Sequence, residues 1–200
     1  MAETPSTELE AVNVILTNMG EAPLNSLSGS LPLDALKAQN VLTEISEECQ
    51  IKGWFWNKET STFAPNGSSQ IALPTNALAI QNKTLTVDLT IRDGLLYRIE
   101  KNNNGNTFTD PVEVEVTYFL PFMDLPPVVR RYVTVKAARI FQGRELGNAE
   151  LIRQDSIEEQ TAWAAMTAEE NVNFRRSLNQ TWSMSMITDR QNLRTGTYRA

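Results

Sequence analysis

The 200-residue chain carries a formal net charge of -6, contains no histidine and has a single cysteine, Cys49. These counts exclude histidine-based catalysis, metal sites built from histidine or several thiolates, and an internal disulfide. A hydrophobic content of 41% and a charged content of 21% are ordinary for a globular chain of one large or two small domains. No apolar run approaches the roughly 18 residues of a membrane span, and the polar, acidic first ten residues predict no signal peptide. We therefore expect the protein in a cytosol or in a particle assembled in one.

The charge is unevenly distributed along the chain. Residues 1–53 hold two lysines and eight acids, whereas residues 126–147 hold five basic residues and the single acid Glu145. Residues 181–200 hold three arginines and one aspartate. An acidic chain with basic segments is typical of proteins that contact partners through charged faces, and atypical of nucleic-acid-binding modules, which are basic overall.

Two helices are predicted in the first third of the chain. Over residues 7–20 the apolar residues recur every three or four positions, as on one buried stripe of a helix. Ser6 or Thr7 can cap its start, and Gly20 suits the left-handed position after its end. A second helical pattern runs from about residue 33 to 52 and ends at Gly53. The residues expected on the buried sides are Leu9, Val12, Leu16 and Met19 in the first helix, and Leu36, Val41, Leu42, Ile45 and Cys49 in the second.

The middle of the chain changes to the two-residue period of β-strands. Alternation over residues 85–91 and 112–118 predicts two half-buried strands. The turn signal at residues 92–94 predicts a hairpin whose second strand covers residues 95–99. Weaker strand signals lie around Phe63 and over residues 71–73 and 78–80.

Helical periodicity resumes after Pro126 and Pro127. A proline fits the first turn of a helix, so the new helix is expected to begin here. A third helix is expected over residues 128–146, and a fourth, rich in Glu, Gln and Ala, over residues 149–178. No helical or strand period is present from Thr181 onward. The third helix is expected to bury Val129, Tyr132, Val133, the stem of Lys136, Ala137 and Ile140.

These patterns predict an α+β fold. Residues 1–53 and 121–180 are expected to form a helical bundle of two N-terminal and two C-terminal helices. Residues 54–120 are expected to form an inserted small antiparallel β domain, and residues 181–200 a C-terminal tail.

The stretch GWFWN, residues 53–57, places three aromatic rings where the second helix gives way to the β region. Exposed rings at such a place would form a platform for stacking bases or sugars. Rings at a helix-to-strand corner are more often core, and only Lys52 and Lys58 nearby are basic. We therefore interpret Trp54, Phe55 and Trp56 as a structural corner, with both tryptophans on one side of the emerging strand and Phe55 on the other.

Carboxylate pairs offer the one enzymatic interpretation. Glu113 with Glu115, and Glu158 with Glu159, would suit a glycosidase if each pair flanked a cleft. Solvated surfaces explain both pairs more simply. The asparagines at 102–104 lack the alternating acids of a calcium loop, so we predict no catalytic, cofactor or metal site.

The predicted third helix is basic through Arg130, Arg131, Lys136 and Arg139. Such a helix can contact phosphates, pair with the acidic first part of the chain, or pair with an acidic neighbour in an oligomer. The sequence leaves these three alternatives open.

Several stretches together resemble a known family. The chain contains, in this order, ELEAVNVILTNMGEAPLNSL, GWFWN, LPFMDLPPVVRRYVTVKAARIF and QGRELG. Each stretch alone is a weak signal, but their order and spacing resemble the tail tubular protein A family of short-tailed phages, the head-to-tail adaptors or gatekeeper rings. The resemblance covers the segment from about Thr7 to Gly147.

The resemblance implies a structural virion protein without catalysis or cofactor. It implies a ring of twelve copies between the capsid portal and a nozzle of the tail tubular protein B type, with genomic DNA passing through its lumen and with tail fibres as further candidate partners. It places the protein in the virion tail, assembled in the host cytoplasm, with no membrane partner. The alternative from the residues is a carbohydrate-degrading or carbohydrate-binding tail component acting through carboxylates and exposed aromatic rings.

The resemblance further implies that the C-terminal part docks on the portal, although residues 181–200 depart from the family pattern. This tail combines apolar anchors with arginines that can form forked hydrogen bonds to carboxylates. The portal-contact candidates are Trp182, Met184, Met186, Ile187, Arg190, Arg194, Tyr198 and Arg199.

Overall fold

The computed structural model describes residues 4–82, 88–99, 105–145 and 149–179. Within these ranges the chain forms four α-helices, one short 3-10 helix and five strands, and the predicted α+β class is confirmed. The helices are α1 (Glu8–Asn18), α2 (Leu33–Gln50), η1 (Phe122–Asp124), α3 (Pro127–Glu145) and α4 (Ala149–Asn179). The strands are β1 (Lys58–Phe63), β2 (Ala77–Asn82), β3 (Leu89–Arg92), β4 (Leu95–Arg98) and β5 (Val112–Tyr118).

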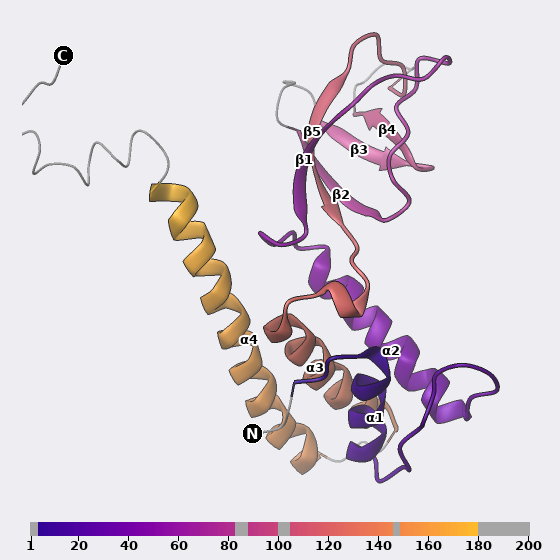
Figure 1. Cartoon of the computed structure of the whole chain (residues 1–200), viewed down its shortest axis with the longest axis vertical. Coiled ribbons are helices and arrows are strands. Elements are labelled where there is room, and N and C mark those ends of the chain that lie inside the picture. Colours follow the sequence, from indigo (N-terminus) through magenta and orange to yellow (C-terminus); the bar gives the residue numbers. More distant parts are fainter. Residues whose placement is uncertain (1–3, 83–87, 100–104, 146–148, 180–200) are drawn as a thin grey trace, which may run out of the picture.

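The helices and the strands lie in two separate parts of the molecule (Figure 1). Helices α1, α2 and α3 pack together, and α4 runs along one side of them and extends beyond the start of α3. The strands lie beyond the C-terminal end of α2, so the chain enters the β region from α2 and returns through η1 into α3.

Local signals account for the starts and ends of several helices. The Thr7 hydroxyl accepts a hydrogen bond from the Glu10 backbone N–H, and the Glu10 carboxylate accepts one in return from the Thr7 N–H, which is a capping box. Gly20 follows α1 with a φ of +82°, and Gly53 follows α2 with a φ of +73°. A side chain at Gly53 would be strained by this φ and would stand 2.9 Å from Lys58 Cδ.

The strands form two antiparallel sheets within the described residues. The first has the order β1-β5-β2, with Lys58 opposite Thr117 and Phe63 opposite Val112 across the β1–β5 pair. The second is the β3–β4 hairpin, where Asp93 and Gly94 both have positive φ, as the predicted turn requires. Of the strand predicted over residues 85–91, the structure describes Leu89–Arg92, and residues 85–87 lie outside the described residues.

The buried side chains that the structure describes form two hydrophobic clusters. One joins α1, α2, η1, α3 and α4, and it includes Ile15, Ile45 and Phe141. The other lies in the β region and includes Ile71, Phe108 and Val114. Each part of the molecule thus has its own core, and the segments between α2 and β1 and between β5 and α3 connect them.

Two details of the predicted packing are wrong. Leu36 was expected on the buried side of α2 but is 43% exposed, while Ala35 and Ala38 are buried. At 100° per residue Leu36 lies about 180° around the helix from the buried Ile45, so it cannot share that face. The expected placement of Trp54 and Trp56 on one side of an emerging strand is also wrong, because no strand is present there. The segment before Lys58 forms a turn, in which the Asn57 N–H donates to the Trp54 carbonyl at 3.2 Å.

Candidate interaction surfaces

The aromatic corner divides into a buried, a half-buried and an exposed ring. Trp54 is 8% exposed, its indole N–H donates to the Cys49 carbonyl at 2.8 Å, and its ring meets the ring of Trp163 edge to face at 5.6 Å. Trp56 is half-buried against the helical core. Phe55 is 41% exposed, and its backbone N–H donates to the Glu170 carboxylate of α4 at 3.2 Å. The three rings therefore do not form one exposed platform.

Two buried amide side chains join the helices to the strands, and the sequence analysis missed both. Gln50 accepts a hydrogen bond from the Leu120 N–H at 2.7 Å and donates to the Leu120 carbonyl at 3.0 Å. Asn57 donates to the carbonyls of Gln50 and Tyr118 and accepts from the Trp54 N–H at 2.7 Å. Together they tie the segment that leaves α2 to the segment that returns from β5.

We name this pair of side chains, Gln50 and Asn57, the polar junction. Buried backbone groups in an irregular connection need hydrogen-bond partners. The polar junction supplies such partners in the connection from α2 to β1 and in the connection from β5 to α3. One sequence signal was available: Gln50 directly follows the buried Cys49 at the end of an apolar stripe, where a polar residue needs a partner. The polar junction fixes how the β region is held on the helices.

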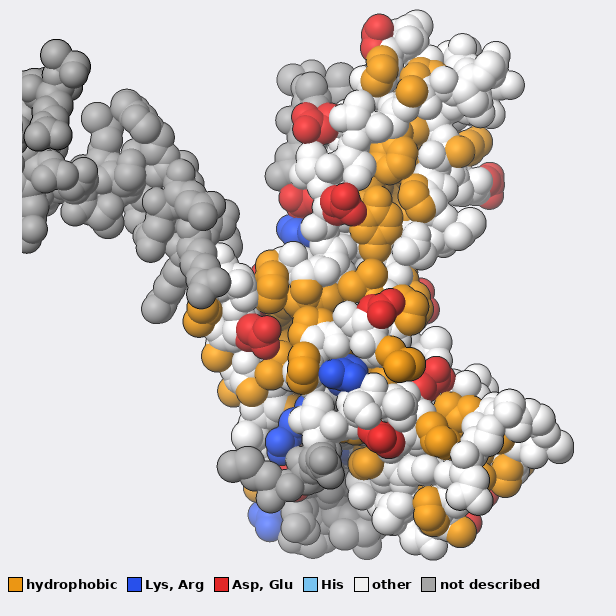
Figure 2. Space-filling view, in the orientation of Figure 1, with side chains coloured by type: hydrophobic (Ala, Val, Ile, Leu, Met, Phe, Trp, Pro, Cys, Tyr) orange, Lys and Arg blue, Asp and Glu red, His pale blue; other side chains and the backbone are white. Residues whose placement is uncertain are grey.

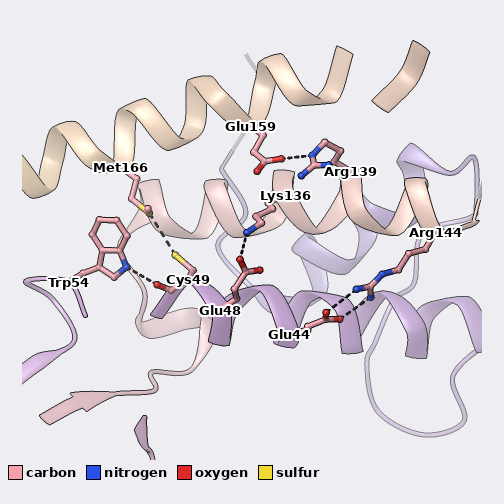
Figure 3. Close-up of polar contacts among 9 residues, drawn as sticks. All are labelled: Glu44, Glu48, Cys49, Trp54, Lys136, Arg139, Arg144, Glu159 and Met166. Atoms are coloured by element: carbon pink, nitrogen blue, oxygen red, sulfur yellow. Dashed lines mark hydrogen bonds and ion pairs between the residues drawn. The ribbon is translucent and has the colours of Figure 1, made fainter. Parts of the chain in front are cut away.

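The cations of α3 mostly pair with acids of the same chain (Figure 3). Lys136 Nζ lies 2.9 Å from a Glu48 oxygen, and Arg144 donates two hydrogen bonds of 2.9 Å to the Glu44 carboxylate. Arg139 pairs with Glu159 of α4. A row of ion pairs therefore follows α3, with α2 on one side and α4 on the other.

Two members of these pairs, Glu44 and Lys136, have pKa values shifted from the ordinary ones. The hydrogen bonds from Arg144 lower the pKa of Glu44 below its ordinary value. Burial by itself lowers the pKa of Lys136, but the hydrogen bond to Glu48 and the nearby negative charges outweigh it, so the pKa is raised. Both shifts favour the charged form, of Glu44 in one pair and of Lys136 in the other.

The two arginines at the start of α3 differ from the rest. Arg130 donates to the Ser6 carbonyl at 2.7 Å and thereby holds the chain before α1. Arg131 is half-buried and has no hydrogen-bond or ion-pair partner within the described residues. Of the four basic positions singled out in the sequence, Lys136 and Arg139 are thus engaged in ion pairs within the chain.

One member of each carboxylate pair forms an ion pair within the chain. Glu115 lies 2.8 Å from Lys58 Nζ, and Glu159 is held by Arg139. Glu159 lines a shallow cavity of about 230 Å³ with Tyr132 and Trp163, whereas Glu158 is exposed on α4. The cavity that Glu159 lines is not lined by Glu158, so within the described residues this pair does not flank a cleft as glycoside cleavage requires.

Two other kinds of site are absent from the part of the chain that the structure describes. There, no group of three or more His, Cys, Asp or Glu side chains is placed to hold a metal ion. In the same ranges, no helix has the length and apolar character needed to cross a membrane. The portal-contact candidates between Trp182 and Arg199 lie outside the described residues.

Comparison with known proteins gives two matches. The model of a family described as "Tail tubular protein" matches residues 9–175. The chain is also similar to a protein of Klebsiella phage KP34 named "Tail tubular protein A", with 29% identity over 119 residues. That alignment covers 60% of this chain and 62% of the phage protein. The family match includes every helix and strand of both hydrophobic clusters except the first residue of α1 and the last residues of α4.

Proposed function

This chain belongs to the tail tubular protein family, and we propose that it is the head-to-tail adaptor of a short-tailed phage. As a family member it is a structural component of a phage tail. In the proposed role, twelve copies form a ring that joins the capsid portal to the tail nozzle and surrounds the path of the genome. The chain carries out no catalysis in this role.

The observation that carries the proposal is the family match over residues 9–175, which spans the helices and the β region together. The charge arrangement supports it. Because Lys136, Arg139 and Arg144 neutralise acids of the same chain, α3 is not a basic strip for binding nucleic acid. A channel that DNA must traverse benefits from weak rather than tight contact with phosphates.

We propose that residues 181–200 are the segment that binds the portal. Trp182, Met184 and Met186 are side chains of the kind enriched at interfaces, and Arg190 and Arg194 can each form two hydrogen bonds to a carboxylate. Deletion of residues 181–200 should abolish co-sedimentation with the portal protein of the same phage and leave the melting temperature almost unchanged. Full-affinity docking of the truncated chain would place the portal contact elsewhere on the chain.

Light scattering and negative-stain electron microscopy test the proposed ring assembly. We expect the isolated chain to be a monomer or a loose oligomer in light scattering, because the sequence predicts no long, uniformly apolar face of the kind that permanent interfaces show. Mixing with portal should produce rings with twelvefold symmetry in negative-stain images. A stable dodecamer of the isolated chain at nanomolar concentration would contradict the first expectation. Glycan hydrolysis by a chain that forms no rings would favour the carbohydrate-degrading alternative.

A further inference from the structure

Helix α4 carries an uncharged face that no other described element covers. Ile157 is 64% exposed and Val172 is 54% exposed, while Ala162 and Met166 on the opposite side of the helix are buried against α3. The exposed residues on the same side as these two are Thr161, Ala164, Ala165 and Ala168, with the exposed Gln160 and Asn171 along one edge and the exposed Glu158 on the other. Figure 2 shows hydrophobic side chains along the outer edge of α4, beside the bundle. We call the set from Ile157 to Val172 the outer face of α4.

A second apolar patch lies at the start of α2. Leu33 is 67% exposed and Leu36 is 43% exposed, and their spacing of three residues places them on one side of the first turn. In Figure 1 the start of α2 lies at the side of the bundle opposite α4. The charged neighbours Asp34 and Lys37 lie 3.5 Å apart, and Lys37 also pairs with Glu145. Covering this patch therefore removes no unpaired charge from water.

We infer that these two surfaces meet between neighbouring copies of the chain: Leu33 and Leu36 of one copy pack on the outer face of α4 in the next. The inference rests on the proposed ring. The two surfaces complement each other in size, because two large protruding side chains face a strip of alanines bounded by Ile157 and Val172. They also differ from each other and lie on opposite sides of the bundle, as the two surfaces of a head-to-tail contact do, and such a contact forms a ring when its rotation closes.

The size of the contact favours a second copy within an assembly over a permanent partner. From Ile157 to Val172 the helix rises about 22 Å, so a strip roughly 10 Å wide offers about 200 Å², far below the about 800 Å² per partner of a stable complex. Such a contact is too small to hold two free chains together. It becomes effective when each copy makes it twice in a ring and the portal holds the copies close.

A disulfide cross-link tests the contact in the full-length protein. The variant Leu33→Cys/Ala164→Cys is mixed with portal, oxidised and run on a non-reducing gel, where we expect a ladder of chain multimers. The matched control is Val14→Cys/Ala164→Cys, because Val14 is a 37% exposed position on α1 outside the proposed contact, and it should give no ladder. The native Cys49 is buried in both variants.

The possible results test the inferred contact and the proposed function separately. Rings without a ladder, or a ladder as strong in the control, would overturn the inferred contact and leave the proposed function standing. A cross-link from Ala164→Cys to portal would assign the outer face of α4 to the portal and also overturn the contact. If the wild-type chain forms no ring with portal, the proposed function fails and the inference fails with it. As a second measurement, Ala165→Arg should cause loss of rings while the melting temperature of the isolated chain stays unchanged.

Discussion

Replacing Trp54 with alanine should destabilise the fold by about 3–5 kcal/mol, the range measured when large buried aromatic residues are truncated in cores. Trp54 is 8% exposed and packs edge to face on Trp163, a geometry that contributes about 0.5–1.5 kcal/mol beyond area burial. The variant also loses the hydrogen bond from the indole to the Cys49 carbonyl, a net contribution of about 1 kcal/mol. These contributions lie within the total rather than adding to it.

Urea unfolding followed by circular dichroism, with linear extrapolation to water, measures the free energy of unfolding. Trp54→Phe separates the two contributions, because it keeps a ring in the cavity and removes the N–H donor, so we expect a loss of about 1–2 kcal/mol. The matched control is Phe55→Ala in the same turn, where the side chain is 41% exposed and the loss should be about 1 kcal/mol or less. Trp56→Ala should lie between the two alanine variants, because Trp56 is half-buried.

The reasoning would be refuted by a Trp54→Ala variant that keeps its free energy of unfolding within about 1 kcal/mol of wild type. If that variant also lost binding to a partner, the aromatic corner would be a binding site. Equal losses in the free energy of unfolding for Trp54→Ala and Phe55→Ala would instead mean that burial does not determine how much each ring stabilises the fold.

Three further outcomes follow from individual contacts. Gln50→Ala should cost about 1–3 kcal/mol in urea unfolding, because it leaves the buried N–H of Leu120 without its partner, and a neutral variant would contradict the role of the polar junction. Burial raises the pKa of the Cys49 thiol to about 11, so at neutral pH a thiol reagent should label Cys49 slowly in the native chain and rapidly once urea has unfolded it. Rapid labelling of the native chain would contradict this. The hydrogen bonds from Ser6, and to a smaller extent the one from Thr7, lower the pKa of Glu10 below its ordinary value. The resulting stability is present above the unfolded-state pKa and is lost as the pH falls through the folded-state pKa, so the stability difference between wild type and Glu10→Gln should shrink on acidification. A difference that stays constant with pH would contradict these hydrogen bonds to Glu10.

The sequence alone determined the features that depend on residues close together in the chain. The capping box needs Thr7 and Glu10 three positions apart, and the β3–β4 turn needs residues that tolerate positive φ at Asp93 and Gly94. The alternation over Val112–Tyr118 likewise predicted a strand that the structure confirms. In each case the physical cause lies within a few residues, so it can be recognised without knowing what packs nearby.

Only the tertiary structure decided which distant residues meet. The pairs Lys136–Glu48 and Arg144–Glu44 join residues 88 and 100 positions apart, and charge alone left their partners open between phosphates, the same chain and another chain. The periodicity could not tell Leu36 from Ala38, because which side of α2 is covered depends on where α1 and α3 pack. The polar junction was missed for the same reason: Gln50 and Asn57 are satisfied by backbone groups of Tyr118 and Leu120, which become their neighbours only when the chain returns from the β region.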